Sequence, residues 1–207
     1  MLVKQLVNSI FESNTYIISD QNSSCVWVID IGDIEGVINN LPENSIIKGV
    51  FLTHEHFDHI FGINKLIELF PKCLVFTSDQ GKHALRSSKL NLSFYHEIPI
   101  EFQSSNTHLL KENDKIEIFE NIYLEAYETP GHTASCLTYK VSEYLFTGDS
   151  FIPGIPVVTK LKGGSREESR KSLRKIESLI KSGSIICPGH GPIKSIDSSS
   201  GPLALFD

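Results

Sequence analysis

The sequence predicts a layered α/β protein, and three observations support that prediction. Short apolar runs rich in β-branched residues recur along the chain, as is typical of buried strands. Segments with helical apolar spacing lie between some of these runs, which favours strands and helices in separate layers. The chain has 207 residues and a hydrophobic content of 40%, enough for one ample core. We therefore expect a single domain over residues 1–207.

The elements follow in order from these patterns. The predicted strands cover residues 2–8, 14–19, 25–30, 46–52, 73–77, 115–119, 121–127, 136–141, 144–147 and 184–187. Residues 34–41 and 166–181 show the i, i+3, i+4, i+7 spacing of amphipathic helices. Another helix is expected over residues 61–70. Residues 86–113 are rich in Ser and Asn and have the least regular pattern, so we expect a lid or a long loop there.

The strongest functional signal is a cluster of metal-binding residue types directly after the predicted strand 46–52. Residues 54–59 are His54, Glu55, His56, Phe57, Asp58 and His59. Imidazole suits zinc or iron, and a carboxylate can complete such a site. His54 and His56 are two residues apart, so in extended backbone they point the same way and can share one ion. Asp58 and His59 lie in the following turn, where they could hold a second ion.

Three further candidate ligands each follow a glycine near the end of an apolar or β-branched run. They are His132, Asp149 and His190. Glycine permits unusual φ angles and close backbone approach, which helps to aim a side chain from a strand end into a crowded site. The pattern therefore predicts a metal centre built from five histidines and two aspartates.

These residues, taken together, resemble the motifs of the metallo-β-lactamase superfamily along nearly the whole chain. Asp30, at the end of a predicted strand, is similar to the first motif of the family; residues 54–59 are similar to the second, and His132, Asp149 and His190 to the other three. The resemblance implies two central sheets flanked by helices, a four-layer αββα sandwich. It also implies a supporting role for Asp30.

The resemblance further implies how the ligands divide between two divalent metal ions. One ion would take His54, His56 and His132, and the other would take Asp58, His59 and His190, with Asp149 bridging them. Zinc is the expected metal, with iron or manganese as alternatives. The two ions would lower the pKa of a shared water toward about 7, providing a hydroxide nucleophile. Asp58 and Asp149 are the expected catalytic residues, with Asp58 orienting the water and moving a proton to the leaving group.

The remaining histidines and the cysteines give no second site. His83, His96 and His108 lack a glycine frame, and we interpret them as surface or loop residues. The cysteines, Cys25, Cys73, Cys136 and Cys187, are widely spaced and form no Cys-x-x-Cys motif. We expect buried small side chains in a reducing compartment.

Composition and charge limit the partners. No stretch approaches the roughly 20 apolar residues of a membrane span, and the N-terminus lacks the features of a signal peptide, so a cytoplasmic location without membrane contact is expected. The net charge of −6 argues against nucleic acid as a partner. Residues 160–181 nevertheless carry eight Lys and Arg against three Glu. Lys160 and Lys162, in the loop after Asp149, could reach an anionic group of a small-molecule substrate.

Within the superfamily, the glycine-framed turns at His132 and His190 look most like glyoxalase II, the hydroxyacylglutathione hydrolases. This likeness implies a hydrolase of a thioester or related ester. The chain ends 17 residues after His190, so we expect the C-terminal helical domain of those enzymes to be absent. The largely apolar segment 151–160 also differs from their basic and aromatic loop. Two alternatives remain: a lactonase of the same fold, or an oxidoreductase similar to persulfide dioxygenases, with one iron on His54, His132 and Asp149.

Overall fold

The computed structural model describes residues 1–197, which divide into two compact units, the first ending at Leu110 and the second beginning at Lys111. Each unit contains a mixed six-stranded sheet. The expectation of one domain over residues 1–207 stays a prediction, and residues 198–207 of that range lie outside the described residues.

In the first unit, the strands are joined in sequence order across the sheet. They are β1 Leu2–Val7, β2 Asn14–Ser19, β3 Cys25–Ile29, β4 Ile46–Phe51, β5 Leu74–Thr77 and β6 Thr107–Leu109. β1, β2 and β3 pair antiparallel, and β3 to β6 pair parallel. Parallel neighbours are buried on both faces, and residues 26–29 of β3 and 49–51 of β4 are buried, whereas Ile46 and Lys48 at the start of β4 are exposed. The carboxyl ends of β3 and β4 therefore reach the same edge of the sheet.

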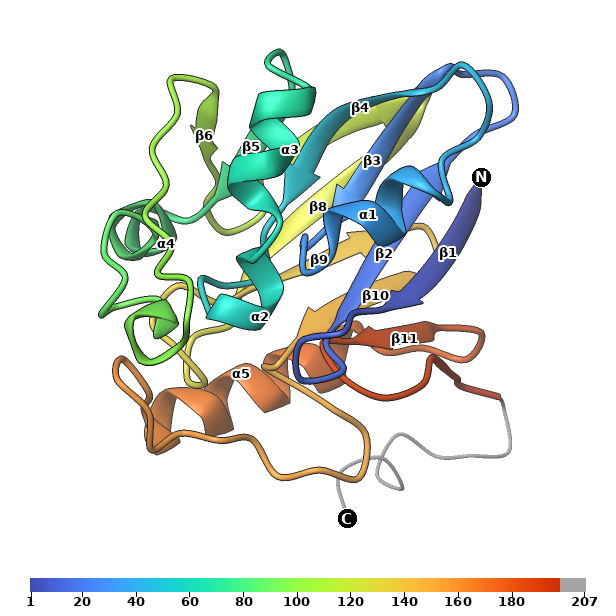
Figure 1. Cartoon of the computed structure of the whole chain (residues 1–207). Coiled ribbons are helices and arrows are strands. Elements are labelled where there is room, and N and C mark those ends of the chain that lie inside the picture. Colours follow the sequence, from blue (N-terminus) through green and yellow to red (C-terminus); the bar gives the residue numbers. More distant parts are fainter. Residues whose placement is uncertain (198–207) are drawn as a thin grey trace. The chain divides into compact units, whose positions relative to one another are not determined.

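The helices of the first unit connect these strands. They are α1 Ile34–Ile38, α2 Phe57–Ile60, α3 Ile63–Leu69 and α4 Asp79–Leu85, with a 3₁₀ turn, η1, at Ser93–Tyr95. Figure 1 shows α1 and α3 side by side in front of the sheet. Val37 of α1 and Leu66 of α3 belong to one buried cluster with Val28 of β3 and Val50 of β4. This apolar packing fixes the loops that follow β3 and β4.

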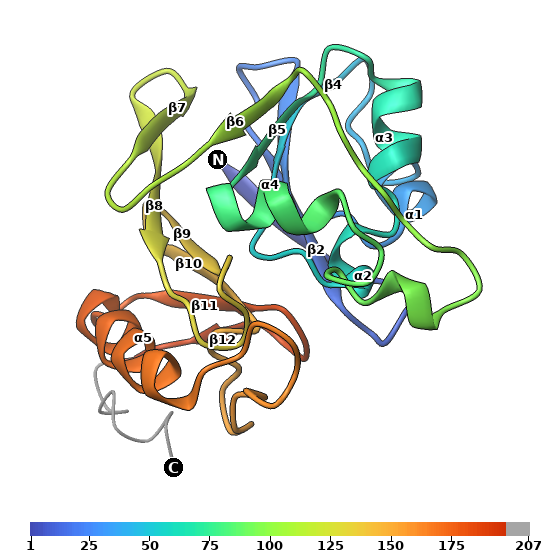
Figure 2. The same cartoon turned by 90° about the vertical axis from the view of Figure 1, so that its left-hand side faces the viewer.

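The second unit has its own sheet and one long helix. Its elements are β7 Lys115–Phe119, β8 Ile122–Glu128, β9 Leu137–Val141, β10 Tyr144–Gly148, α5 Arg166–Leu179, β11 Ile185–Pro188 and β12 Lys194–Ser195. The strand order is β12-β11-β10-β9-β8-β7, and only β10 and β11 pair parallel. Ile176 of α5 is buried with Leu145 and Ile186 of the sheet, and α5 is drawn beside β11 in Figure 2.

Most predicted elements are confirmed, with ends shifted by one to three residues. The main differences are the elements that the sequence patterns did not predict: α2, α4, η1, β6 and β12. Ser78 begins α4, since its hydroxyl accepts a hydrogen bond from Gly81 N at 3.0 Å, a favoured N-cap arrangement. The predicted helix over residues 61–70 is present as α3, and the shorter α2 precedes it.

The Ser- and Asn-rich segment 86–113 has more regular structure than its composition predicts. It contains η1 and β6, and the buried Asn91 side chain donates to the Ile100 carbonyl oxygen at 2.9 Å. Ile100 N donates to the Ser93 hydroxyl at 2.7 Å. Polar side chains here replace the backbone pairing that a longer strand or helix would provide.

Within residues 1–197, every helix is too short or too polar to cross a bilayer. The cytoplasmic location expected from the sequence stays a prediction.

Candidate metal centre

The first set of candidate ligands lies immediately after β4. The chain bends at Thr53 after the strand, and His56, the N-cap of α2, has extended backbone with φ −61° and ψ 147°. The rings of His54 and His56 lie close together, with centroids 4.8 Å apart. Their candidate ligand atoms lie within 4.8 Å of each other.

Asp58 and His59 lie inside α2, not in a turn before a helix as the sequence pattern predicted. Phe57 and Ile60 are buried in the core on either side of them, and this packing closes the short helical turn. The Nε2 atom of His59 lies 3.4 Å from Oδ2 of Asp58. The His59 ring also lies 4.3 Å, centroid to centroid, from the ring of His54.

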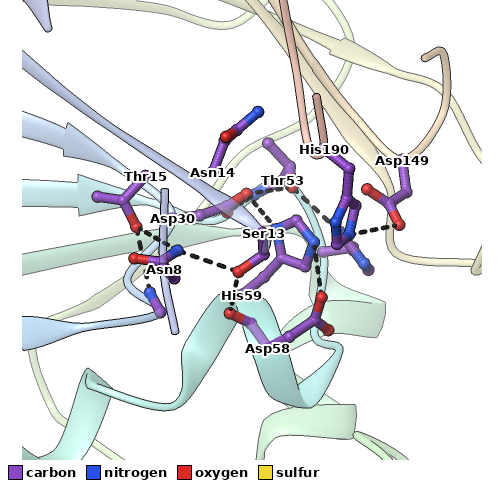
Figure 3. A network of polar contacts seen from close by, with 12 residues as sticks. Asn8, Ser13, Asn14, Thr15, Asp30, Thr53, Asp58, His59, Asp149 and His190 are labelled. Carbon is purple, nitrogen blue, oxygen red and sulfur yellow. Dashed lines mark hydrogen bonds and ion pairs between the residues drawn. The ribbon is translucent and has the colours of Figure 1, made fainter. Parts of the chain in front are cut away.

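Asp30, the predicted supporting residue, organises this first set from the end of β3 (Figure 3). Its carboxylate is buried and accepts three hydrogen bonds: from Thr53 N at 2.7 Å, from the Thr53 hydroxyl at 2.7 Å, and from His59 Nδ1 at 2.8 Å. Asp30 has a φ of 55°, a conformation that costs energy outside glycine. Its carboxylate thus joins the loop after β3 to both ends of the ligand segment.

These hydrogen bonds decide which nitrogen of each imidazole can bind a metal. The His59 Nδ1–H donates to Asp30, so the neutral ring carries its lone pair on Nε2. The Thr53 hydroxyl gives its hydrogen to Asp30 and therefore accepts from Nδ1 of His54, at 3.0 Å. His54 is then also left with an Nε2 lone pair. A carboxylate or hydroxyl behind each histidine is the usual surrounding of a metal-binding imidazole.

A second layer of polar side chains, which the sequence reasoning missed, holds the segment from the β1–β2 turn. Ser13 donates its hydroxyl to the backbone oxygen of Asp58 at 2.7 Å. Asn8 in turn donates to the Ser13 and Thr15 hydroxyl oxygens, at 3.0 and 3.1 Å. Local patterns could not indicate this support, since Ser13 and Asp58 are 45 residues apart in the sequence.

The second set of candidate ligands lies in the second unit and is positioned by backbone turns. Asp149 follows β10, and His190 follows β11, the strand that pairs parallel with β10. His132 follows Gly131, whose φ is 141°. A Cβ at Gly131 would lie 2.3 Å from the backbone nitrogen of Ser169 in α5, so this turn requires glycine.

Within this set, one carboxylate oxygen lies nearly midway between two imidazoles. Oδ2 of Asp149 is 3.6 Å from Nε2 of His132 and 3.5 Å from Nε2 of His190; the contact with His190 is drawn in Figure 3. Nδ1 of His132 donates to the Val158 carbonyl oxygen at 2.8 Å. Because a carbonyl oxygen only accepts, neutral His132 carries its lone pair on Nε2, facing Asp149.

Both sets fit divalent metal ions by their donor chemistry. Ligands about 2.0–2.2 Å from a tetrahedral ion are roughly 3.3–3.6 Å apart. The separations of 3.4, 3.5 and 3.6 Å between histidine nitrogens and aspartate oxygens match that spacing, and they exceed the 2.7–3.2 Å of an ordinary N–H···O hydrogen bond. The donors are all imidazole nitrogens and carboxylate oxygens, a set that suits zinc, iron and manganese.

Lys160 and Lys162 lie exposed in the loop between β10 and α5. Val158, whose carbonyl accepts from His132, precedes them in the same loop. The substrate-binding role expected for the two lysines stays a prediction.

The other histidines lie outside the ligand sets. His83 is exposed on α4 and His108 is exposed on β6. His96 follows η1 and is half-buried, because its ring stacks on Phe57 at 4.3 Å with an interplanar angle of 6°. It lines a cavity of about 370 Å³ in the first unit together with Phe57 and Phe61. His96 is therefore a packing residue of this aromatic cavity.

The cysteines confirm the expectation of small packed side chains. Cys73, Cys136 and Cys187 are buried, Cys25 is half-buried, and none of them forms a disulfide. Burial raises the pKa of Cys73 to about 12 and raises the pKa of Cys187 well above its usual range. Neutral thiols at physiological pH are poor metal ligands, because the thiolate is the binding form.

Comparison with protein families gives one match that spans most of the chain. Residues 43–190 match the model of the metallo-beta-lactamase superfamily. Among curated proteins, the hydroxyacylglutathione hydrolase of Hydrogenovibrio crunogenus is 26% identical over 182 residues, covering 86% of this chain. The chain spans 59% of the length of that relative.

Solved structures with a similar fold include a B3 metallo-beta-lactamase, BLEG-1. It is 27% identical, with a TM-score of 0.84 over 93% of each chain. TTHA1623, solved in a di-iron-bound form, is 20% identical, with a TM-score of 0.78 over 93% of this chain and 94% of that one. The predicted fold class, an α/β metallo-β-lactamase fold with two sheets and helices, is confirmed by these likenesses.

Proposed function

The chain belongs to the metallo-beta-lactamase superfamily, and from this premise we propose that it is a metal-dependent hydrolase of thioesters or related esters, similar to glyoxalase II. The superfamily and the name of the hydroxyacylglutathione hydrolase relative both support a hydrolase. The observation that carries the proposal is the Asp149 carboxylate, whose Oδ2 faces Nε2 of both His132 and His190 at nearly equal distances. An oxygen in that position suits a bridging ligand.

We propose that the two ligand sets together hold two divalent ions. His54, His56 and His132 would bind one ion. Asp58, His59 and His190 would bind the other, with Asp149 as the shared ligand. The Nε2 lone pairs that Asp30, Thr53 and Val158 impose on His59, His54 and His132 support this assignment. Zinc is the metal we propose, with iron and manganese as the alternatives that metal analysis distinguishes.

When bound, such ions supply a hydroxide nucleophile at neutral pH and polarise the ester carbonyl. The protein residues have separate tasks. Asp30 holds His59 and, through Thr53, His54 in the metal-binding tautomer. Asp58 accepts a proton on its carboxylate and passes it to the leaving thiol or alcohol. Its backbone oxygen is anchored by Ser13, which holds this part of α2 in place.

Lys160 and Lys162 complete the proposed roles by attracting an anionic part of the substrate. Both ammonium groups lie in water, so their effect acts through approach and orientation of the substrate, with a modest contribution to binding.

A substrate panel tests the proposed reaction. Protein loaded with zinc, iron or manganese would be assayed on thioesters, including an acylglutathione, and on lactones and oxygen-ester analogues, with thiol release and oxygen consumption recorded together. The proposal expects thioester hydrolysis without oxygen uptake, lost on chelation and restored by metal. Oxygen uptake with a persulfide by protein that holds one iron would overturn it.

A further inference from the structure

The second unit contains a cavity of about 230 Å³ that borders a candidate metal ligand. His190 forms part of its wall, and the segment after β11 forms the rest of that side. Ile152, Pro153 and Ile155, in the loop after Asp149, also line the cavity. Pockets for drug-sized ligands measure about 300–1,000 Å³, so this cavity is suited to one short group of a larger molecule.

The walls of this cavity are aliphatic and rigid. Ile152, Ile155 and Ile193 line it, together with Pro153, Pro188 and Pro192. Proline fixes its own φ angle, which reduces the freedom of both wall segments before a ligand binds.

Residues 152–155, which contribute to the cavity wall, form a closed turn. Ile155 N donates to the Ile152 carbonyl oxygen at 3.0 Å, and the two residues form an isolated β-bridge. The side chain of Ile155 is nevertheless 54% exposed. An isoleucine held at the mouth of a cavity by a closed turn offers apolar surface to a ligand rather than to the core.

One fixed charge lines the cavity beside His190. It belongs to Lys194 on β12, and no Asp or Glu is among the lining residues. Lys194 is exposed, and within residues 1–197 its ammonium forms neither a salt bridge nor a hydrogen bond. An unpaired ammonium beside aliphatic walls favours a ligand that joins an anionic group to an aliphatic one.

We propose that this cavity binds a short branched aliphatic group of the substrate and that Lys194 pairs with a carboxylate carried by the same part of the molecule. The inference deepens the proposed function, on which it rests for the role of His190. It specifies the substrate class as thioesters or esters with a small, branched, carboxylate-bearing portion.

Direct binding tests the inference without turnover. The probes are 4-methylpentanoate, its neutral amide 4-methylpentanamide, and acetate, titrated into metal-loaded protein while the backbone amide signals of Gly191 and Ile193 are followed by NMR. Lys194→Met should weaken 4-methylpentanoate binding about 5- to 10-fold and leave the amide unchanged. Lys181→Met is the matched control, because Lys181 is an exposed lysine of the same unit outside the cavity lining.

A second variant separates the apolar contact from the charge. Ile155→Ser should weaken binding of both six-carbon probes about 3- to 10-fold, with acetate unaffected. If the carboxylate bound only through the metals, 4-methylpentanoate would bind wild type and Lys194→Met with equal affinity. That result, or signal changes absent at Gly191 and Ile193 in the wild type, would overturn the inference.

The same variants distinguish failure of the inference from failure of the proposed function. Probe binding that depends on Lys194 and Ile155, in a protein that hydrolyses no thioester, would support the cavity and reject the proposed reaction. Thioester hydrolysis with probe binding unchanged in Lys194→Met and Ile155→Ser would support the reaction and reject the cavity as a substrate site.

Discussion

The two ligand sets are held in place by different means. In the first unit, side chains support the ligands: Asp30, Thr53 and Ser13 all bond to the segment around residues 54–59. In the second unit, the backbone provides the support: a carbonyl oxygen holds His132, and Gly131 makes its turn possible.

The two sets also differ in access to water. In the first set the side chains of His59 and Asp58 are 0% and 12% exposed. In the second set the His132 side chain is 4% exposed, but those of Asp149 and His190 are 14% and 24% exposed, and His190 lines a cavity. We therefore expect the first set to fix the metal geometry. In the second set, His190 combines its proposed metal-binding role with a place on a cavity wall that a substrate could reach. Mutations should therefore affect the two sets in different ways.

The largest effect is expected at Asp149, the proposed shared ligand. Asp149→Ala removes the oxygen that faces both His132 and His190, so bound metal should fall below two ions per chain. Hydrolysis should fall at least about 1,000-fold, because both the nucleophile and the carbonyl activation depend on the ions. Elemental analysis and initial rates on the same preparation measure the two effects. If the number of bound ions per chain and the hydrolysis rate were unchanged, Asp149 would not be a metal ligand.

Asp30→Asn tests the side-chain support of the first set. The amide cannot accept all three hydrogen bonds that the carboxylate accepts, so metal affinity or activity should fall about 10- to 100-fold. Affinity is measured by competition with a chromogenic chelator, and circular dichroism verifies folding.

Thr53→Val is the matched variant for Asp30→Asn. It removes only the hydroxyl link between Asp30 and His54 and should cost about 10-fold or less. A Thr53→Val loss larger than that of Asp30→Asn would show that Asp30 does not organise this set.

Gly131→Ala tests the backbone support of the second set. The added Cβ would meet the backbone of Ser169 at 2.3 Å, at a φ of 141°, so the free energy of unfolding should fall by about 2–4 kcal/mol. Gly183→Ala is the control, because its φ of 86° is also positive but nothing lies within 4 Å of the added atom; about 1 kcal/mol is expected there. Urea denaturation compares the two, and equal losses would contradict the close packing at Gly131.

The smallest effect is expected from the exposed lysines. Lys160→Ala combined with Lys162→Ala should raise KM for anionic thioesters about 3- to 10-fold and leave KM for neutral ones unchanged. The kinetic comparison should be made at low and high salt, since screening reduces the effect of exposed charges. An equal change in KM for neutral substrates would show that these lysines do not recognise the anionic group.

Local sequence patterns predicted the strands and ligand types because both depend on neighbouring residues. The β-branched runs became β3 and β4, and residues 54–59 follow the second of them. The short α4 did not follow from its pattern, because it contains Gly81 and depends on the Ser78 cap and on burial of Leu85. β12 is two exposed residues paired only with β11, which leaves no periodicity to detect.

Features formed by distant residues were not accessible from local patterns. Asp30 could be assigned a supporting role by resemblance, but its contacts to Thr53 and His59 join residues 23 and 29 positions apart. The contribution of Asn8 and Ser13, and the cavity beside His190, likewise depend on tertiary packing.

We propose that ligands from both sets bind the same ions, and metal counting in a double-mutant cycle tests this sharing. His59→Ala removes a ligand of the first set, and His190→Ala removes one of the second. If both bind the same ion, elemental analysis should find two ions in wild type, one in each single variant, and still one in the double variant. A double variant that loses both ions, one for each mutation, would mean that the two sets bind metal independently and would contradict the account.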